Sequence, residues 1–80
     1  MKVQVLFFGA TAEETGEREI EFDFAEPATK AAAAFEKIVA AYPNLQKHSL
    51  LFAVNQEYAN GDEQINDGDE LAIFTAVSGG

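Results

Sequence analysis

The sequence predicts an α+β fold in which a mixed sheet of four to five strands packs on one main helix. Residues 17–24 alternate between acidic and apolar side chains, as in a strand with one solvated face. Residues 31–42 carry apolar side chains at helical spacing. The other apolar runs are short and bounded by turn-forming residues, which is typical of further strands. At 80 residues the chain is expected to form one domain.

The first two strands are predicted to pair as a hairpin. The first strand places alternate apolar residues on one face, namely Val3, Val5 and Phe7. The second strand does the same with Ile20, Phe22 and Phe24. Residues 10–16 between them are short and mixed in character, and we expect a turn or one short helix there.

The helix is predicted to lie between two prolines. Pro27 is expected to open it, because the missing N–H costs nothing in the first turn, and Pro43 is expected to end it. The alanines at 31–34 have slim side chains, so the helix can lie close to the sheet. Turn chemistry then delimits three strands, at 50–54, 57–59 and 70–76. One mixed sheet with one helix on a single face is the β-grasp architecture.

The face of the sheet turned away from the helix should be polar, but apolar side chains are predicted there. Alternation along the strands puts Leu6, Phe8 and Phe74 on this face, with Tyr58 nearby. If the first and last strands are neighbours, Phe8 and Phe74 share an exposed patch. Several exposed aromatic residues together indicate a partner-binding surface. The alternative is that residues 10–16 fold over them.

Charge and composition argue against several classes of function. The net charge of −9 repels phosphate backbones and anionic membranes, so we expect neither a nucleic-acid nor a membrane partner. The acidic surface fits a basic protein partner, general solubility or salt adaptation. With no cysteine and one histidine, no metal site is expected. The apolar N-terminal run is too short for a membrane span, and a soluble cytoplasmic protein is expected.

The end of the chain carries the most distinctive functional group. Val77, Ser78, Gly79 and Gly80 follow the last predicted strand, which divides the chain into a domain at 1–76 and a flexible tail at 77–80. Glycine has no Cβ, so the terminal dipeptide can enter a narrow channel in another protein. The Gly80 carboxylate becomes reactive toward sulfur or amine nucleophiles once it is activated as an acyl-adenylate. The chain has no phosphate-binding glycine loop, so a separate ATP-using enzyme is implied and no bound cofactor is expected.

Four blocks of the sequence resemble a known family. They read Val-Leu-Phe-Phe-Gly at 5–9, Phe-Ala-Val-Asn-Gln-Glu-Tyr at 52–58, Asp-Gly-Asp-Glu-Leu-Ala-Ile-Phe at 67–74 and Val-Ser-Gly-Gly at 77–80. With these blocks in order, the chain resembles the small subunit of molybdopterin synthase, within the MoaD/ThiS family of ubiquitin-like sulfur carriers. One departure is Thr75-Ala76, where the family usually has two prolines; it makes this backbone strand-capable and more flexible.

The resemblance implies a mechanism and a set of partners. An E1-like enzyme would adenylate Gly80 with ATP, and a sulfur donor would convert it to a thiocarboxylate. The tail, including Val77, Ser78 and Gly79, would then enter the large subunit of molybdopterin synthase, in a heterotetramer. There the sulfur would pass to cyclic pyranopterin monophosphate and form the molybdopterin dithiolene. The implied hydrophobic contacts with the partner are made by Phe8, Tyr58 and Phe74.

Three alternatives stay open at this point. The protein could carry sulfur in another pathway, such as synthesis of the thiamine thiazole. It could be a ubiquitin-like modifier attached to lysines through Gly80. It could also be an interaction domain whose tail is inert.

Overall fold

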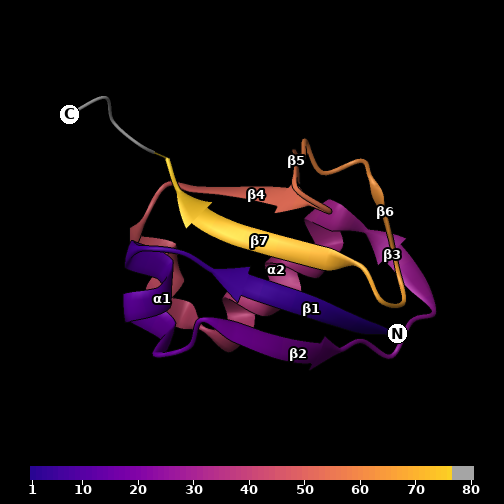
Figure 1. The fold of residues 1–80 in the computed structure, drawn as a ribbon, viewed down its shortest axis with the longest axis horizontal. Helices are drawn as coiled ribbons and strands as arrows, with labels where there is room; N and C mark the ends of the chain where they lie inside the picture. The colour runs from indigo at the N-terminus through magenta and orange to yellow at the C-terminus, as the bar shows by residue number, and fades with distance from the viewer. Residues whose placement is uncertain (77–80) are drawn as a thin grey trace.

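The computed structural model describes residues 1–76; the predicted tail at 77–80 lies outside the described residues. Its main sheet has five strands in the order β2-β1-β7-β4-β5 (Figure 1). These strands are β1 (Lys2–Phe7), β2 (Glu19–Asp23), β4 (Leu50–Val54), β5 (Glu57–Tyr58) and β7 (Glu70–Thr75). The β1–β7 pair is parallel and the other three pairs are antiparallel. The predicted mixed sheet is therefore confirmed.

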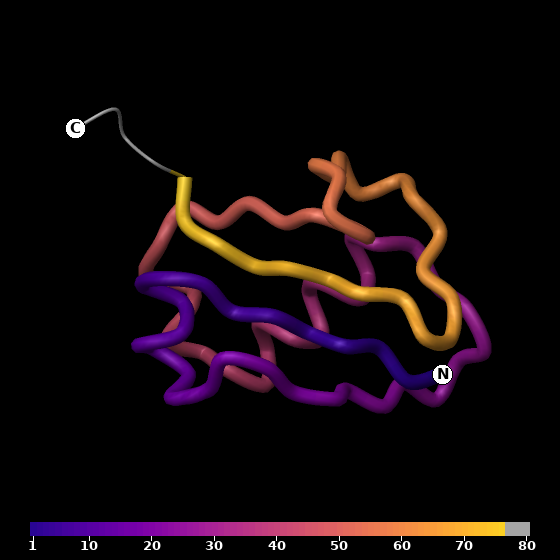
Figure 2. Tube along the Cα trace, in the orientation of Figure 1, coloured from indigo at the N-terminus to yellow at the C-terminus, as the bar shows by residue number. Residues whose placement is uncertain are grey.

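The first and last strands lie side by side in the middle of the sheet. Figure 2 shows β1 and β7 running in the same direction along the centre of the molecule. Their register pairs Val5 with Leu71 and Phe7 with Ile73. The two strands are therefore neighbours, as the predicted patch requires.

One face of the sheet packs against α2 (Ala31–Ala41), which lies behind the sheet in Figure 1. The inward side chains of β1 and β7 are almost fully buried, namely Val3, Val5, Phe7, Leu71 and Ile73. Ala31, Ala34 and Ile38 of the helix meet them in the same core. The two alanines have no exposed surface, in agreement with the expected close approach of helix and sheet. A 3₁₀-helix η1 (Pro43–Lys47) follows and adds the buried Leu45.

The helix begins four residues later than predicted. The prediction that Pro27 opens it is wrong, because residues Ala28–Lys30 form β3, which pairs with β6 (Gln64–Asn66) in a second, two-stranded sheet. Neither strand was predicted from the sequence. The first N–H groups of α2 donate to carbonyls of the loop just before β6. Ala31 donates to Glu63 (2.7 Å) and Ala32 donates to Gly61 (3.0 Å). Backbone carbonyls therefore accept the hydrogen bonds that a capping side chain usually accepts.

The loop that caps α2 is itself held by Glu63. Its carboxylate accepts hydrogen bonds from the backbone N–H groups of Asn60 and Gly61, each at 2.9 Å. Gly61 has a φ of 110°, and a Cβ there would stand 3.1 Å from the Cβ of Ala32, so glycine is needed for this close contact. The hydrogen bond from Asn60 is the main cause that lowers the pKa of Glu63 below its ordinary value of 4.5.

The short segment before β2 is a helix, α1 (Ala10–Thr15), which ends at Gly16 in the left-handed conformation. Thr11 anchors it to the sheet and is fully buried. The Thr11 hydroxyl donates to the Ile73 carbonyl of β7 (2.8 Å) and accepts from the Phe8 N–H (2.9 Å). A single hydroxyl therefore fixes the end of β1, the start of α1 and the centre of β7 together. In the part of the chain described here, no helix has the length and apolarity to cross a membrane.

Replacing Glu63 with Gln is expected to lower the melting temperature at pH 7, because a single amide oxygen cannot accept both loop N–H groups equally well. A carboxylate with a lowered folded pKa stabilises the fold above its unfolded pKa, and this contribution is lost as pH falls through the folded pKa. The difference in melting temperature between Glu63→Gln and the native protein should therefore be constant from pH 7 down to about pH 5, and it should become smaller below that pH. Thermal unfolding measured over this pH range tests it. Glu57→Gln, at an exposed position of β5, removes the same charge and should leave the melting temperature unchanged across this pH range.

Thr11→Val keeps the shape of the side chain but removes its hydroxyl, and is expected to cost about 1–3 kcal/mol of unfolding free energy. Thr11→Ser keeps the hydroxyl and loses one buried methyl, which costs about 0.8 kcal/mol. Urea unfolding of the two variants separates the contributions. A serine variant less stable than the valine variant would show that packing, and not the hydrogen bonds, holds α1 to β7.

Candidate functional site

An apolar surface covers one end of the sheet face turned away from α2. The strand register brings its members together: Leu6 lies opposite Ala72, Ala72 opposite Ala53, and Ala53 opposite Tyr58. Leu51 lies opposite Phe74 in the same way. We call this surface the aromatic patch; its residues are Leu6, Phe8, Leu51, Ala53, Tyr58, Ala72 and Phe74.

Several large side chains of the aromatic patch are open to solvent. Phe8 is 52% exposed, Leu51 42% and Tyr58 80%. Phe74 is half-buried, with its ring in edge-to-face contact with Tyr58 at a centroid distance of 5.8 Å. The three aromatic residues predicted at this face, Phe8, Tyr58 and Phe74, are thus brought together by β1, β5 and β7. An exposed aromatic cluster on a sheet face is typical of a protein-binding surface.

The alternative that residues 10–16 cover the aromatic patch is wrong for Phe8, which stays half open. The helix α1 instead packs beside the end of β1, where Thr11 is bound to β7. Leu51 is a member of the patch that the sequence did not identify. The run 50–54 is apolar at every position, so alternation gave no sign of which side chains face outward. Only its pairing with β7 fixes Leu51 beside Phe74.

The chain leaves the sheet at the end that carries the aromatic patch. Because β1 and β7 are parallel, Phe8 and Thr75 lie at the same edge of the sheet, at the left of Figure 1. Thr75 pairs with Leu50, and the Ala76 N–H donates to the Ser49 carbonyl at 2.9 Å. A proline at position 76 could not make this hydrogen bond. The Thr75-Ala76 segment is therefore strand-like, as expected, up to the last described residue.

The predicted reactive and partner-contacting residues of the tail, Val77, Ser78, Gly79 and Gly80, lie outside the described residues. Ala76, the last residue that the structure describes, lies at the end of the sheet that carries the aromatic patch.

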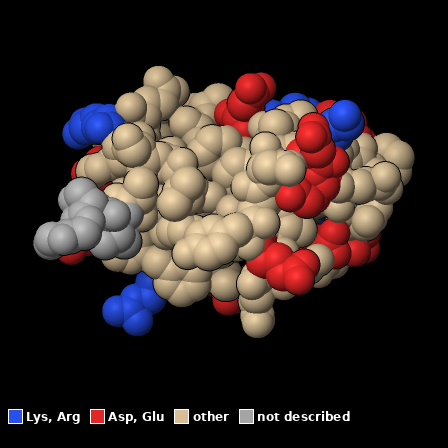
Figure 3. All heavy atoms as spheres, turned by 90° about the horizontal axis from the view of Figure 1, so that it is seen from above, with Lys and Arg blue, Asp and Glu red and all other residues tan. Residues whose placement is uncertain are grey.

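Charged side chains are distributed unevenly around this end of the molecule. Figure 3, seen from above, shows a broad uncharged surface across the middle, with basic side chains at the left margin and most acidic side chains toward the right. On the outer face of the sheet the acidic side chains belong mainly to the edge strand β2, as Glu19, Glu21 and Asp23. They border the aromatic patch, because Glu19 lies opposite Leu6. The patch thus has an apolar centre and an acidic margin.

No group of three or more potential ligands that could hold a metal ion occurs within residues 1–76. The His48 side chain is 30% exposed, and its Nε2 lies 3.5 Å from a carboxylate oxygen of Glu14. This contact joins the end of η1 to α1, which is a structural role.

Comparison with known proteins identifies relatives along the whole chain. Residues 5–80 match the ThiS family. The molybdopterin synthase sulfur carrier subunit of Chlamydomonas reinhardtii is 36% identical, and the match covers 100% of both chains. The protein of the same name from Homo sapiens is 33% identical, with 99% of this chain and 94% of that protein covered.

The fold is also similar to that of solved structures. The crystal structure of SAMP1 from Haloferax volcanii superposes with a TM-score of 0.85 at 28% identity and covers 100% of both chains. SAMP1 is a ubiquitin-like protein with the β-grasp fold, so the predicted fold class is confirmed. Both the sequence match and the architecture extend over nearly the entire chain, and we conclude that this protein belongs to the ThiS family.

Proposed function

We propose that this protein is the sulfur carrier subunit of a molybdopterin synthase. The observation that carries the proposal is the position of the last described residue. Ala76 follows β7, which pairs with a strand on each side, and it lies beside the exposed aromatic patch. A carrier needs both features, since it must dock on a partner and deliver the end of its chain into that partner's active site. The full-length relatives named molybdopterin synthase sulfur carrier subunit support the identity of the cargo and of the enzyme.

The chemistry takes place at the carboxylate of Gly80. An E1-like enzyme joins this carboxylate to the adenylyl group of ATP and releases pyrophosphate. Sulfur at the oxidation level of sulfide then displaces AMP and leaves a thiocarboxylate. In the large subunit this sulfur bonds to cyclic pyranopterin monophosphate, and water hydrolyses the resulting thioester, which leaves the sulfur on the pterin and returns Gly80 as a carboxylate. Two such transfers build the dithiolene. This chain supplies the carried sulfur, while the large subunit catalyses the reaction and the activating enzyme binds the ATP.

The residues of this chain act by binding and positioning. Phe8, Tyr58 and Phe74 dock on the partner, because together they offer an apolar surface that water solvates poorly. The hydrogen bond from the Ala76 N–H to the Ser49 carbonyl holds the backbone to the sheet up to the last described residue. Gly79 and Gly80 present no side chain to a narrow channel.

A second candidate function is covalent protein modification. It is favoured by the likeness to SAMP1, a small archaeal modifier protein. Both functions begin with adenylation of Gly80, and they differ in the nucleophile that follows. Mass spectrometry of natively purified protein separates them. A thiocarboxylate shows the mass increase for sulfur in place of oxygen, whereas a modifier yields lysine peptides linked to Gly-Gly.

Deleting Gly80, or adding one residue after it, is expected to abolish sulfur transfer, because the reactive carboxylate is then misplaced in both enzymes' active sites. Thermal unfolding checks that both variants keep the stability of the native protein. The readouts are thiocarboxylate formation with the activating enzyme and dithiolene formation with the large subunit. Undiminished transfer by either variant would contradict the role of Gly80.

Phe8→Asp and Phe74→Asp are each expected to weaken binding to the large subunit by about 2 kcal/mol or more, roughly 30-fold, because each puts a charge into an apolar contact. Calorimetry or surface plasmon resonance measures the affinity, and circular dichroism checks the fold. Ala25→Asp adds the same charge at an exposed loop position between β2 and β3 and serves as the control. Unfolding of both aromatic variants would show that these residues belong to the core.

A further inference from the structure

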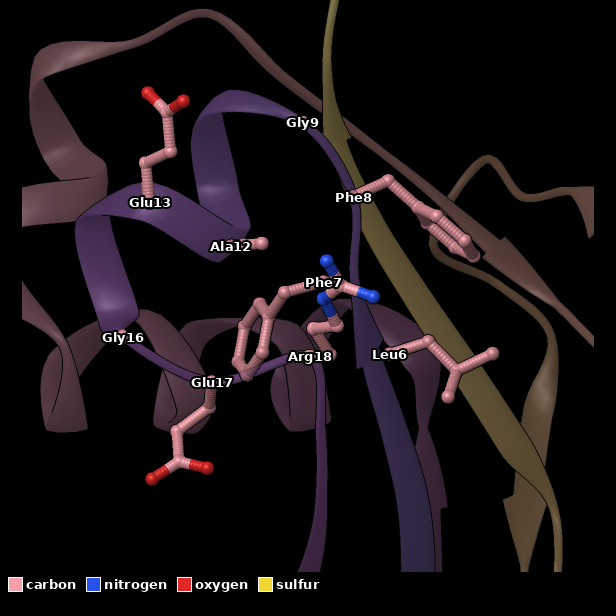
Figure 4. Close-up of a pocket in the computed structure, with 9 residues that line it drawn as sticks. All are labelled: Leu6, Phe7, Phe8, Gly9, Ala12, Glu13, Gly16, Glu17 and Arg18. Atoms are coloured by element: carbon pink, nitrogen blue, oxygen red, sulfur yellow. The ribbon is translucent and has the colours of Figure 1, made fainter.

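A groove runs beside the aromatic patch, between α1 and the start of β2 (Figure 4). It is open to solvent and has a volume of about 640 Å³. Leu6, Phe7, Phe8 and Ala12 supply apolar side chains to it, and Arg18 supplies a guanidinium. Phe8 belongs to both surfaces, so the groove and the aromatic patch form one continuous face.

Arg18 stands apart from most other basic residues of the described chain. Lys2, Lys37 and Lys47 each lie within 4.0 Å of a carboxylate, those of Glu21, Glu26 and Glu14 respectively. Within residues 1–76 Arg18 forms no such ion pair, although Glu13 and Glu17 line the same groove. Figure 4 shows why: the two glutamates point away, whereas the Arg18 side chain extends between Phe7 and Leu6. The guanidinium is thus directed toward the apolar face.

The backbone fixes the position from which Arg18 extends. The Phe7 N–H donates to the Arg18 carbonyl at 2.9 Å, and the next residue, Glu19, pairs with Leu6. Arg18 is therefore bound to the end of β1, immediately before Phe8. Its guanidinium is available to a molecule that docks on the aromatic patch.

We propose that Arg18 is a specificity-determining contact for the partner that receives the tail. The partner places an apolar side chain in the groove and pairs an Asp or Glu carboxylate with the guanidinium. This inference rests on the proposed function, because it assigns the chemistry of the large subunit at the edge of the same interface.

Charge complementarity favours a carboxylate as the group that meets Arg18. Arginine presents a planar set of N–H donors that matches a carboxylate in two parallel hydrogen bonds. Once the partner covers the groove, the apolar walls and the partner together exclude water around such a pair and strengthen its attraction. The chain as a whole has a net charge of −9, so an acidic group on the partner is repelled almost everywhere else on this surface. Beside the aromatic patch, Arg18 is the basic group that meets the partner's carboxylate, and this contact fixes the orientation of the docked partner.

The test compares two charge reversals in the full-length chain. Arg18→Glu is expected to weaken binding to the purified large subunit at least tenfold, mainly through faster dissociation, because it sets two carboxylates against each other. Lys30→Glu makes the same change of charge at an exposed position before α2, in the other sheet, and should change the affinity less than about twofold. Arg18→Lys should fall between the native protein and Arg18→Glu, because a lysine keeps the charge and loses the paired geometry.

Two further measurements separate this inference from the proposed function. Thermal unfolding should show that Arg18→Glu remains folded, since the side chain is exposed. If native protein binds the large subunit and Arg18→Glu binds equally well, or if Lys30→Glu is equally impaired, the role of Arg18 is overturned while the proposed function stands. If the native protein itself does not bind the large subunit, the proposed function fails, and this inference fails with it.

Discussion

Parallel pairing of β1 with β7 brings the first and last strands of the chain together in the middle of the sheet, and Phe7 faces Ile73 across this pair. The inward side chains of the two strands form the centre of the core, while their outward side chains form the aromatic patch. Because the strands run in the same direction, both end at one edge. Thr11 reinforces the pair by hydrogen bonding to Phe8, directly after β1, and to Ile73 within β7. The stability of the fold and the geometry of the site therefore depend on the same pair of strands.

Periodicity in the sequence was sufficient for the elements whose two faces differ. The alternation of Ile20, Phe22 and Phe24 with acidic residues predicted β2, and the apolar stripe predicted most of α2. It failed where the local pattern is uninformative. The strands β3 and β6 are three residues long and exist through their pairing with each other, which no local signal reports. The helix starts at Ala31 and not at Pro27, because its first N–H groups are satisfied by a loop that follows much later in the chain.

The candidate site shows the same division. Phe8 and Phe74 could be predicted from alternation alone, on the assumption that their strands are neighbours. Leu51 could not, because every residue of its strand is apolar and only the register with β7 sets its direction. Arg18 was equally hidden. An arginine among acidic residues suggests a surface ion pair, and its lack of one within the described chain emerges only when the directions of Glu13 and Glu17 are known.

The hydrogen bond between Ala76 and Ser49 has a mechanical consequence. It keeps the backbone bonded up to Ala76, the last described residue, so this point moves together with the sheet. In a carrier that docks through the aromatic patch, as proposed above, a rotation on the partner would turn Ala76 with it. Such a carrier would need a partner that holds it in one orientation.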